Sequence, residues 1–294
     1  MLHAERPDCV KISVITVCFN AVETIADTIQ SVRSQSHPNL EYIVVDGGST
    51  DGTLGIIAQN RDVVSVLVTG PDNGMFDAAN KGINAASGKI VGMLNADDFY
   101  ADKDVLRDVA NTFATGIEAV YGDLHYVDRQ RPQKIKRNWV SGLYDRKNFL
   151  LGWMPPHPTF FICKSAYDRF GMFRSDLKSA ADYELMLRML YKHSLKPGYI
   201  DRVLVKMRVG GKSNVSIANR LRANREDRKA WNINGLKPAW YTLCFKPLSK
   251  IGQYSAGLGI LDRALGRGVA RGVYDGPARK PGERTGDHSG AWRF

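Results

Sequence analysis

The chain has 294 residues, of which 44% are hydrophobic and 24% charged, a composition that fits a globular protein with a core and excludes a disordered or fibrous one. Its net charge of +11 is confined to the last third, because residues 1–200 hold 22 Lys and Arg against 23 Asp and Glu, whereas residues 201–294 hold 19 against 7. The four cysteines are scattered without a CxxC pair, which argues against a zinc or dithiol site and is typical of a reducing compartment.

Signals for export or membrane insertion are not expected. The stretch MLHAERPDCV lacks a basic start followed by an apolar run, so no secretory signal is predicted. No run of 18 apolar residues occurs, so no membrane-spanning helix is predicted and the chain is expected to be cytoplasmic. The basic last third is compatible with nucleic acid, an anionic membrane, an acidic substrate or a solvated tail, and charge alone does not choose among them.

Strand-like and helix-like stretches alternate along residues 11–122. Apolar runs rich in β-branched residues predict strands at 12–18, 42–45, 63–68, 90–94 and 119–121. Amphipathic spacing predicts helices around 25–32 and at 53–59, 78–86 and 106–113. Asn20 is the expected cap of the first helix. The alternation predicts an α/β fold, with helices on both faces of a mostly parallel, Rossmann-like sheet.

The rest of the chain is less regular. A strand is predicted at 157–163, a helix at 180–191 and a charged helix at 217–231. We expect an α/β domain over 1–215, a basic and partly amphipathic helical extension over 216–270, and a disordered tail rich in Gly, Arg and Pro over 271–294.

Polar motifs follow each of the first four predicted strands. They are CFN (18–20), DGGSTDGT (46–53), PDNG (71–74) and NADD (95–98). Because the carboxyl ends of parallel strands share one edge of a sheet, and ligands bind there, we expect the four motifs to gather at that edge.

The first acidic motif, VVDGGSTDGT (44–53), fits neither an EF-hand loop nor a nucleotide-binding glycine fingerprint. Asp51 is expected to cap the helix that follows. Asp46 stands at the strand terminus itself, where a carboxylate can accept hydrogen bonds from a ribose or a base edge. The alternative is a glycine-rich turn that binds nothing.

The second acidic motif, NADD, places Asp97 and Asp98 side by side at a strand end. Adjacent carboxylates are costly unless a cation or solvent relieves their repulsion. Two oxygen donors suit Mg²⁺ or Mn²⁺ shared with substrate phosphates, and the alternative is a solvated turn.

The stretches ISVITVCFN, EYIVVDGGSTDGT and PDNGMFDAANKGINAASGKIVGMLNADD resemble the family 2 glycosyltransferases over residues 11–100. Further on, PPHPTFF (155–161), AADYELMLR (180–188) and Gly-Gly-Lys-Ser (210–213) are similar to the same family, and most of all to bacterial enzymes of exopolysaccharide synthesis, such as those for colanic acid. The resemblance implies a GT-A fold and an inverting, metal-dependent transferase that uses nucleotide-activated sugars.

The resemblance also implies roles for residues of the donor site. The backbone around Thr16 and Val17, together with Asn20, would border the nucleotide. Asp46 would bind the base, and Asp77 lies in the stretch that lines the nucleotide pocket.

The same resemblance implies a metal site and a general base. Asp97 and Asp98 would hold Mn²⁺ or Mg²⁺ against the diphosphate, and Asp182 would take the proton of the acceptor hydroxyl. Two positions depart from the family pattern: Asn95 stands where an Asp is common, and Ala181 replaces the Glu that precedes the base. These departures bear on the strength of metal binding and on whether Asp182 has a raised pKa.

Three basic residues are weaker candidates. His157, between Pro156 and Pro158, would contact phosphate or acceptor, or else is structural. Arg188 and Lys89 are interpreted as solvated charges rather than as diphosphate ligands.

The last third mixes aromatic and apolar with basic residues over 237–254, a combination that suits a membrane interface. Its members are Lys237, Trp240, Tyr241, Leu243, Phe245, Lys246, Leu248, Lys250, Ile251 and Tyr254. Because family acceptors are often lipid-linked sugars, we expect a glycan or lipid-linked acceptor and peripheral binding to the anionic inner membrane. The alternative is a helix packed on the catalytic domain.

Three other functions compete with this one. A nucleotidyltransferase would carry a G-x-G-T-R loop after the first strand, where this chain reads CFNAVET. A basic nucleic-acid-binding protein would explain the charge of the last third but not the acidic strand ends, which repel phosphate, so no nucleic acid is expected. An inactive family member would explain Asn95 and Ala181.

Overall fold

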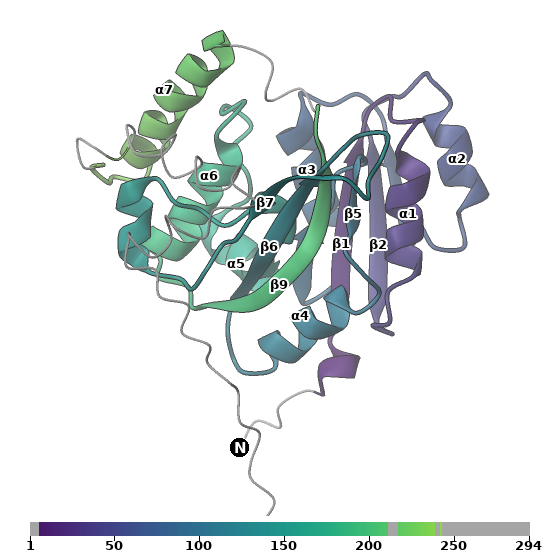
Figure 1. Ribbon diagram of the computed structural model, residues 1–294, viewed down its shortest axis with the longest axis horizontal. Helices are drawn as coiled ribbons and strands as arrows, with labels where there is room; N and C mark the ends of the chain where they lie inside the picture. Colours follow the sequence, from purple (N-terminus) through teal and green to yellow (C-terminus); the bar gives the residue numbers. More distant parts are fainter. Residues whose placement is uncertain (1–5, 211–216, 239–241, 243–294) are drawn as a thin grey trace, which may run out of the picture. The chain divides into compact units, whose positions relative to one another are not determined.

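The computed structural model describes residues 6–210, 217–238 and 242, with side chains described outside 211–224, and a nine-stranded sheet runs through them (Figure 1). The sheet order is β3-β2-β1-β4-β8-β6-β9-β5, and β7 pairs with β6. All of the described residues belong to one unit, Met1–Gly257.

The first half of the sheet is parallel, as the alternation of elements predicts. Its strands are β1 (Ile12–Cys18), β2 (Leu40–Asp46), β3 (Val66–Thr69) and β4 (Ile90–Met93). All seven residues of β1 are buried, because this strand has a strand on each side and helices over both faces. Its last residue, Cys18, pairs with Asp46, so these two strands end level with each other.

The second half of the sheet contains both parallel and antiparallel strand pairs. It consists of β5 (Asp98–Tyr100), β6 (Ala119–Val127), β7 (Ile135–Trp139), β8 (Phe161–Cys163) and β9 (Pro197–Arg208). β8 is antiparallel to both β4 and β6, whereas β9 is parallel to β6 and antiparallel to β5. The strands β6 and β9 therefore end at the same edge as β1–β4, and β5 and β8 begin at that edge.

Two hydrophobic cores lie on the two faces of the sheet. Alternate residues of β1 point to opposite faces, with Ile12 and Val14 in one core and Ile15 and Val17 in the other. The first core is covered by α1 (Ile25–Arg33), α2 (Thr53–Gln59) and α4 (Val105–Phe113). The second is covered by α3 (Met75–Ala85), α5 (Lys164–Phe170), α6 (Ala181–Met186) and α7 (Ile217–Ile233).

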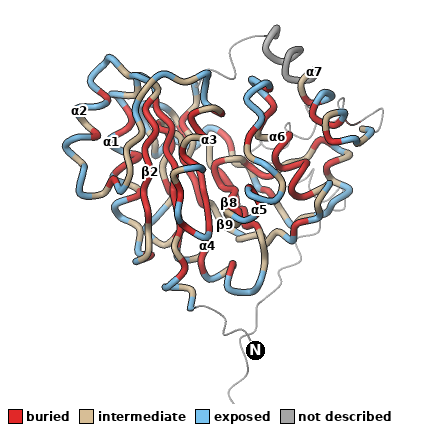
Figure 2. The backbone as a smooth tube through the Cα atoms, turned by 180° about the vertical axis from the view of Figure 1, so that it is seen from behind, coloured by how far each residue is buried: buried red, intermediate tan, exposed pale blue. Residues whose placement is uncertain are grey.

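Shorter helical turns complete the fold. They are η1 (Pro7–Cys9), η2 (Arg146–Leu151) and η3 (His157–Thr159), which are 3₁₀ turns, and η4 (Leu187–Lys192), a π-helical turn that continues α6. Figure 2 shows the strands buried between helices whose outer faces are exposed. The predicted α/β fold with helices on both faces is confirmed.

The structure corrects several local predictions. Asn20 does not cap the first helix, which begins at Ile25 after Thr24. The strand predicted at 157–163 is shortened to β8, because Pro158 falls within a 3₁₀ turn. The helix predicted at 78–86 begins three residues earlier, at Met75, so that Asp77 lies in its first turn.

Some predictions fall outside the described residues. The disordered tail at 271–294 does, as does most of the predicted membrane-binding run at 237–254. Among the residues that the structure describes, no helix is both long enough and apolar enough to cross a bilayer.

Candidate active site

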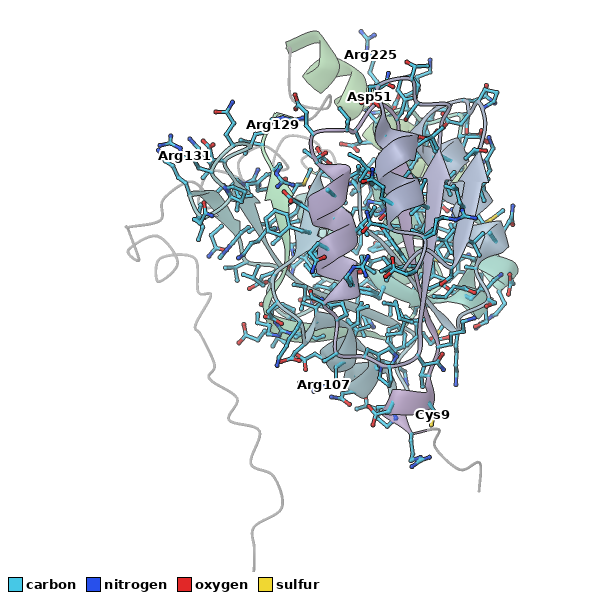
Figure 3. All side chains as sticks on the ribbon, turned by 90° about the vertical axis from the view of Figure 1, so that its right-hand side faces the viewer. Cys9, Asp51, Arg107, Arg129, Arg131 and Arg225 are labelled. Atoms are coloured by element: carbon cyan, nitrogen blue, oxygen red, sulfur yellow. The ribbon has the colours of Figure 1, made fainter. Side chains whose placement is uncertain are left out.

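The loops after the parallel strands meet at one edge of the sheet, as expected from their order. Figure 3 shows Asp51, from the loop after β2, and Arg129, from the loop after β6, at the same end of the molecule. Cys9 and Arg107 lie at the opposite end. Residues far apart in the sequence therefore face the same edge, which is where a ligand of such a sheet binds.

Asp46 is fully buried at the end of β2. Its Oδ2 accepts hydrogen bonds from the main-chain N–H groups of Gly48 and Ser49, both at 2.9 Å. Gly48 has a φ of +89°, which a residue with a side chain rarely adopts, so the glycine allows this tight turn. The Oδ1 atom has the thiol of Cys18 at 3.5 Å, and a thiol is a weak donor, so Oδ1 retains acceptor capacity.

The loops after β1 and β2 are held together by their polar side chains. Asn20 accepts the N–H of Thr50 on its Oδ1 atom at 2.9 Å, and its own N–H donates to Ser49 Oγ at 2.8 Å. Asp51 accepts the N–H groups of Val22 and Thr53, both at 3.0 Å. The predicted cap is wrong, since the residue at the cap position is Gly52, but the Asp51 carboxylate still accepts the N–H of the first residue of α2.

Thr16 and Val17 lie inside the sheet rather than at its edge. Thr16 is fully buried, and its Oγ1 atom accepts a hydrogen bond from the hydroxyl of Tyr42 at 3.1 Å. The Val17 side chain belongs to the core beneath α3. Their side chains are therefore occupied by packing, and the predicted role of their backbone remains a prediction.

A second acidic group lies beside the first, after β3. Asp72 accepts the N–H of Gly74 at 2.8 Å, and a Cβ atom on Gly47 would come within 2.4 Å of its Oδ2 atom, so the loops after β2 and β3 touch. Asp77 accepts the N–H of Asn73 at 3.1 Å and pairs with Lys81 at 3.5 Å. A pocket of about 290 Å³ lies at this end of α3. It is lined by residues 73–77 together with Ser175, Leu177 and Lys178.

The NADD loop connects β4 to β5 and places its two carboxylates differently. Asp98 is fully buried, and its Oδ2 atom accepts a hydrogen bond from the Asn95 side chain at 3.1 Å. Asp97 is half-buried. The Oδ1 atoms of Asp98 and Asn95 are both buried without a hydrogen-bond partner among the described residues. Because an unpaired buried acceptor is costly, these two oxygens are suited to bind a cation or to accept from a donor on a ligand.

Charge repulsion and burial act together on this acid pair. Burial raises the pKa of Asp97, and burial together with the charge of Asp97 raises the pKa of Asp98 well above its usual range. Arg208 and Arg129 oppose the shift at Asp97. A divalent cation would relieve the same repulsion, so the residues fit a metal that prefers oxygen ligands.

Asp97 and Asp98 alone do not supply a full set of metal ligands. Within the described part of the chain, no three His, Cys, Asp or Glu side chains converge in a way that could hold a metal ion. Mg²⁺ and Mn²⁺ are commonly held by one or two carboxylates, with substrate phosphate and water completing their coordination. The pair therefore suits a cation that arrives with a diphosphate.

Asp182 lies in the first turn of α6 and is half-buried. Its Oδ1 atom accepts the N–H of Tyr183 at 2.7 Å. Burial lowers the pKa of the His157 imidazole, and the negative charge of Asp182 opposes that shift. His157 packs edge-on against Phe173 with a ring separation of 5.5 Å, so its ring is held against the segment that leads into α6.

The segment that carries Asp182 is tied to the donor side of the edge. Asn80 of α3 donates to the carbonyl of Phe173 at 2.8 Å and accepts its N–H at 3.0 Å. The ring of Phe173 stacks on that of Phe76, next to Asp77, at 5.4 Å. The donor-side helix and the base segment are thus held in a fixed relation.

The interpretation of Arg188 as a solvated charge is wrong. It is about 9% exposed, and its guanidinium donates to both carboxylate oxygens of Glu184 and to three main-chain carbonyls, those of Phe170, Gly171 and Met172. The arginine is therefore a structural anchor for α6 and does not face the edge.

A profile of glycosyl transferase family 2 matches residues 13–174, which is more than half of the chain and includes the motifs after β1–β4. The chain belongs to glycosyl transferase family 2. An uncharacterized glycosyltransferase of Mycobacterium tuberculosis is 30% identical over 184 residues, covering 60% of this chain and 68% of the relative. TuaG of Bacillus subtilis, which is named for teichuronic acid biosynthesis, is 41% identical over 99 residues, covering 33% of this chain and 39% of TuaG.

Solved structures agree on the fold of this glycosyltransferase. S. aureus TarS in complex with UDP-GlcNAc superposes with a TM-score of 0.60 at 18% identity, covering 76% of this chain and 65% of the TarS chain. The chain therefore spans just under two thirds of that structure's length. A mannosyltransferase from Pyrobaculum calidifontis, in complex with GDP-Man and Mn²⁺, superposes with a TM-score of 0.53 at 19% identity, covering 89% of this chain and 80% of the other.

Three residues at the edge were not singled out from the sequence. Asp72 stands in PDNG, a motif that marks the edge without indicating which residue matters. Arg129 follows β6, but the strand predicted there covers only residues 119–121 and so does not reach Arg129. Arg208 ends β9, which was missed although Val205 and Met207 alternate with Lys206 and Arg208 in the manner of a strand.

Proposed function

We propose that this glycosyltransferase is an inverting, metal-dependent hexosyltransferase of bacterial cell-surface polysaccharide synthesis. It moves a sugar from a nucleoside diphosphate to an acceptor hydroxyl. The proposal is supported by one observation above all: the acidic loops after β2, β3 and β4 lie at one edge of the sheet, and Phe173, on the segment that leads into α6, is bonded to α3 beside them. Membership of the family favours a glycosyltransferase over a nucleotidyltransferase.

The roles proposed for the acidic residues are those that the resemblance to the family implies, and their positions are compatible with them. Asp46 offers a buried acceptor for the base, and Asp77 stands at the pocket beside α3. Asp97 and Asp98 would hold the Mn²⁺ or Mg²⁺, which when bound neutralises the charge that gathers on the departing diphosphate. Asp182 removes the proton of the acceptor hydroxyl, and a single displacement inverts the anomeric carbon.

The acceptor is proposed to be a glycan or a lipid-linked sugar at the anionic inner membrane. Names of relatives support this class, because TuaG is named for teichuronic acid and mycobacterial relatives that are 26% identical are named for PGL/p-HBAD biosynthesis. An inactive family member is the competing proposal, since Asn95 and Ala181 depart from the family pattern.

Donor binding is tested by thermal denaturation with UDP, GDP and other nucleoside diphosphates, each with and without Mn²⁺. A ligand present at 100 times its dissociation constant adds about 2.7 kcal/mol of stability, which raises Tm by roughly 5–10 °C for a unit of this size. We expect one nucleotide to stabilise the protein, and Mn²⁺ to add to its effect in the wild type but not in Asp97→Ala. If no nucleoside diphosphate shifts Tm with or without Mn²⁺, the proposed donor class is wrong.

Base catalysis is tested with Asp182→Asn. The amide keeps the size of the side chain but cannot take a proton, so transfer should fall by about 10²–10⁴-fold while donor affinity is retained. Asp176→Asn is the matched control, because Asp176 lies on the same segment with its carboxylate paired to exposed Arg174 and Lys229. Transfer measured from a labelled nucleotide sugar at full rate in Asp182→Asn would remove this residue from the role.

A further inference from the structure

Arg208, the last residue of β9, is a buried cation at the edge of the sheet, with 4% of its surface exposed. Its guanidinium donates to the main-chain carbonyl of Asp97 at 3.0 Å and to that of Arg129 at 3.3 Å. It also forms an ion pair with Asp27 of α1. One side chain therefore joins α1, the NADD loop and the loop after β6, which are far apart in the sequence.

The geometry of this anchor is restricted. The guanidinium stands over the ring of Phe99 with its central carbon 5.0 Å from the ring centroid. A planar group with five donors, stacked on a ring and bonded on several sides, has little freedom to move. The NADD loop is held from a second direction as well, because the hydroxyl of Thr28 donates to the Asp98 carbonyl at 2.7 Å.

Arg208 also acts on the carboxylates of the loop. Its positive charge attracts the carboxylates of both Asp97 and Asp98. The Asp97 carbonyl that it binds belongs to the peptide joining the two acids. Holding that peptide plane in place fixes the positions of both Cα atoms, and so restricts where the two side chains begin.

We propose that Arg208 is the positioning residue of the NADD loop, holding the peptide between Asp97 and Asp98 so that their carboxylates are in place for the divalent cation. This role rests on the proposed function, in which the cation binds together with a nucleoside diphosphate. Arg208 itself does not touch the cation, since its donors are engaged by carbonyls and by Asp27.

The test is Mn²⁺ affinity, measured by the paramagnetic resonance signal of free Mn²⁺ in the presence of the nucleoside diphosphate that stabilises the wild type. Arg208→Met keeps the length of the side chain and removes its charge and donors, whereas Arg208→Lys keeps the charge. Loss of a residue that orients metal ligands typically weakens metal binding by about 10–100-fold, which we expect for Arg208→Met, with an intermediate value for Arg208→Lys.

Arg202→Gln is the matched control on the same strand, because Arg202 is partly exposed and pairs with Asp102 and Asp108. It should retain the wild-type Mn²⁺ affinity, and nucleotide affinity without metal should be the same in all variants. A general loss of packing would lower nucleotide affinity as well, which separates positioning from a merely structural effect.

The outcomes separate the two proposals. Equal Mn²⁺ affinity in the wild type and in a folded Arg208→Met or Arg208→Lys variant overturns the role of Arg208 alone. If Arg208→Met does not fold, Arg208→Lys decides by the same comparison. If the wild type binds nucleotide but no Mn²⁺, the metal-dependent function and the role of Arg208 fall together.

Discussion

Asp98 combines full burial, a neighbouring carboxylate and an oxygen that has no partner within the described part of the chain. Such a residue costs stability in the unliganded protein, because a buried charge needs compensation. At functional sites this cost is commonly offset when the ligand binds. The side chain of Asn95 shares the task by donating to Asp98, so the departure from the usual Asp has a structural consequence: it replaces a third negative charge with a donor.

Glu41 shows the opposite balance at the other end of β2. Burial alone would raise its pKa, but hydrogen bonds from Ser13, Ser87 and Lys11 outweigh burial and lower the pKa to about 2. The carboxylate thereby joins β1 and β2 to the turn after α3. Its role is structural, since it lies away from the edge where the acidic loops meet.

The pH dependence of stability in Glu41→Gln tests this balance between burial and hydrogen bonding. Because folding lowers the pKa from its ordinary value of 4.5, the stabilisation is complete above that value and is lost as the pH falls through about 2. We expect Glu41→Gln to lower the free energy of unfolding by about 2 kcal/mol at pH 7, the order found for hydrogen bonds to a charged group, and the difference to shrink toward pH 2. The measurement is urea denaturation at a series of pH values.

The control for that series is Glu118→Gln, since Glu118 is only partly buried and pairs with exposed Arg169. It should change stability by less than about 0.5 kcal/mol at any pH. A difference between wild type and Glu41→Gln that stays constant down to pH 2 would contradict the assigned cause.

At the scale of elements, α7 holds the segment that carries the candidate base. Trp231 is fully buried, and its indole N–H donates to the hydroxyl of Tyr183 at 2.9 Å. Asn234 donates to Glu184 at 3.0 Å. Figure 1 shows α7 next to α6. A helix from beyond residue 215 thus supports the helix that carries Asp182 in its first turn.

Trp231→Ala tests the importance of this support. Removing a buried tryptophan typically costs about 3–5 kcal/mol, so we expect a loss of that order in the free energy of unfolding. Arg228→Ala, on an exposed position of the same helix, should change stability by less than about 0.5 kcal/mol. Equal thermal and urea denaturation of the two variants would favour a domain that ends at residue 215, as the sequence-based boundary has it.

At the scale of the whole molecule, the charge is divided between an evenly balanced first part and a strongly basic last third. A charge excess of this size attracts an anionic surface, with an energy of about 1 kcal/mol for each basic residue close to it. In the proposed function, the acidic edge binds a diphosphate together with a divalent cation. The basic last third is therefore suited to an anionic surface, whereas the acidic edge is suited to a diphosphate that binds through a cation.

Vesicle sedimentation tests the proposed membrane association. We expect the full chain to sediment with vesicles that contain anionic lipid and to remain in solution with neutral ones, and the bound fraction to fall as salt screens the charge. A chain ending at residue 257 is the comparison that separates the contribution of the run at 237–254 from that of the remaining basic residues. Equal sedimentation with both kinds of vesicle would count against an electrostatic membrane site.

The sequence by itself determined the parallel half of the fold and the acidic side chains of its edge. Apolar runs, helix periodicity and strand-end Asp residues are local patterns, and the rule that parallel strands end at one edge turns them into a site. Only the tertiary structure decided how Asp98 is buried, that Arg188 is an anchor and that Arg208 reaches the NADD loop. These depend on contacts between distant segments, such as Arg208 with Asp27 at a separation of 181 residues, which no local pattern records.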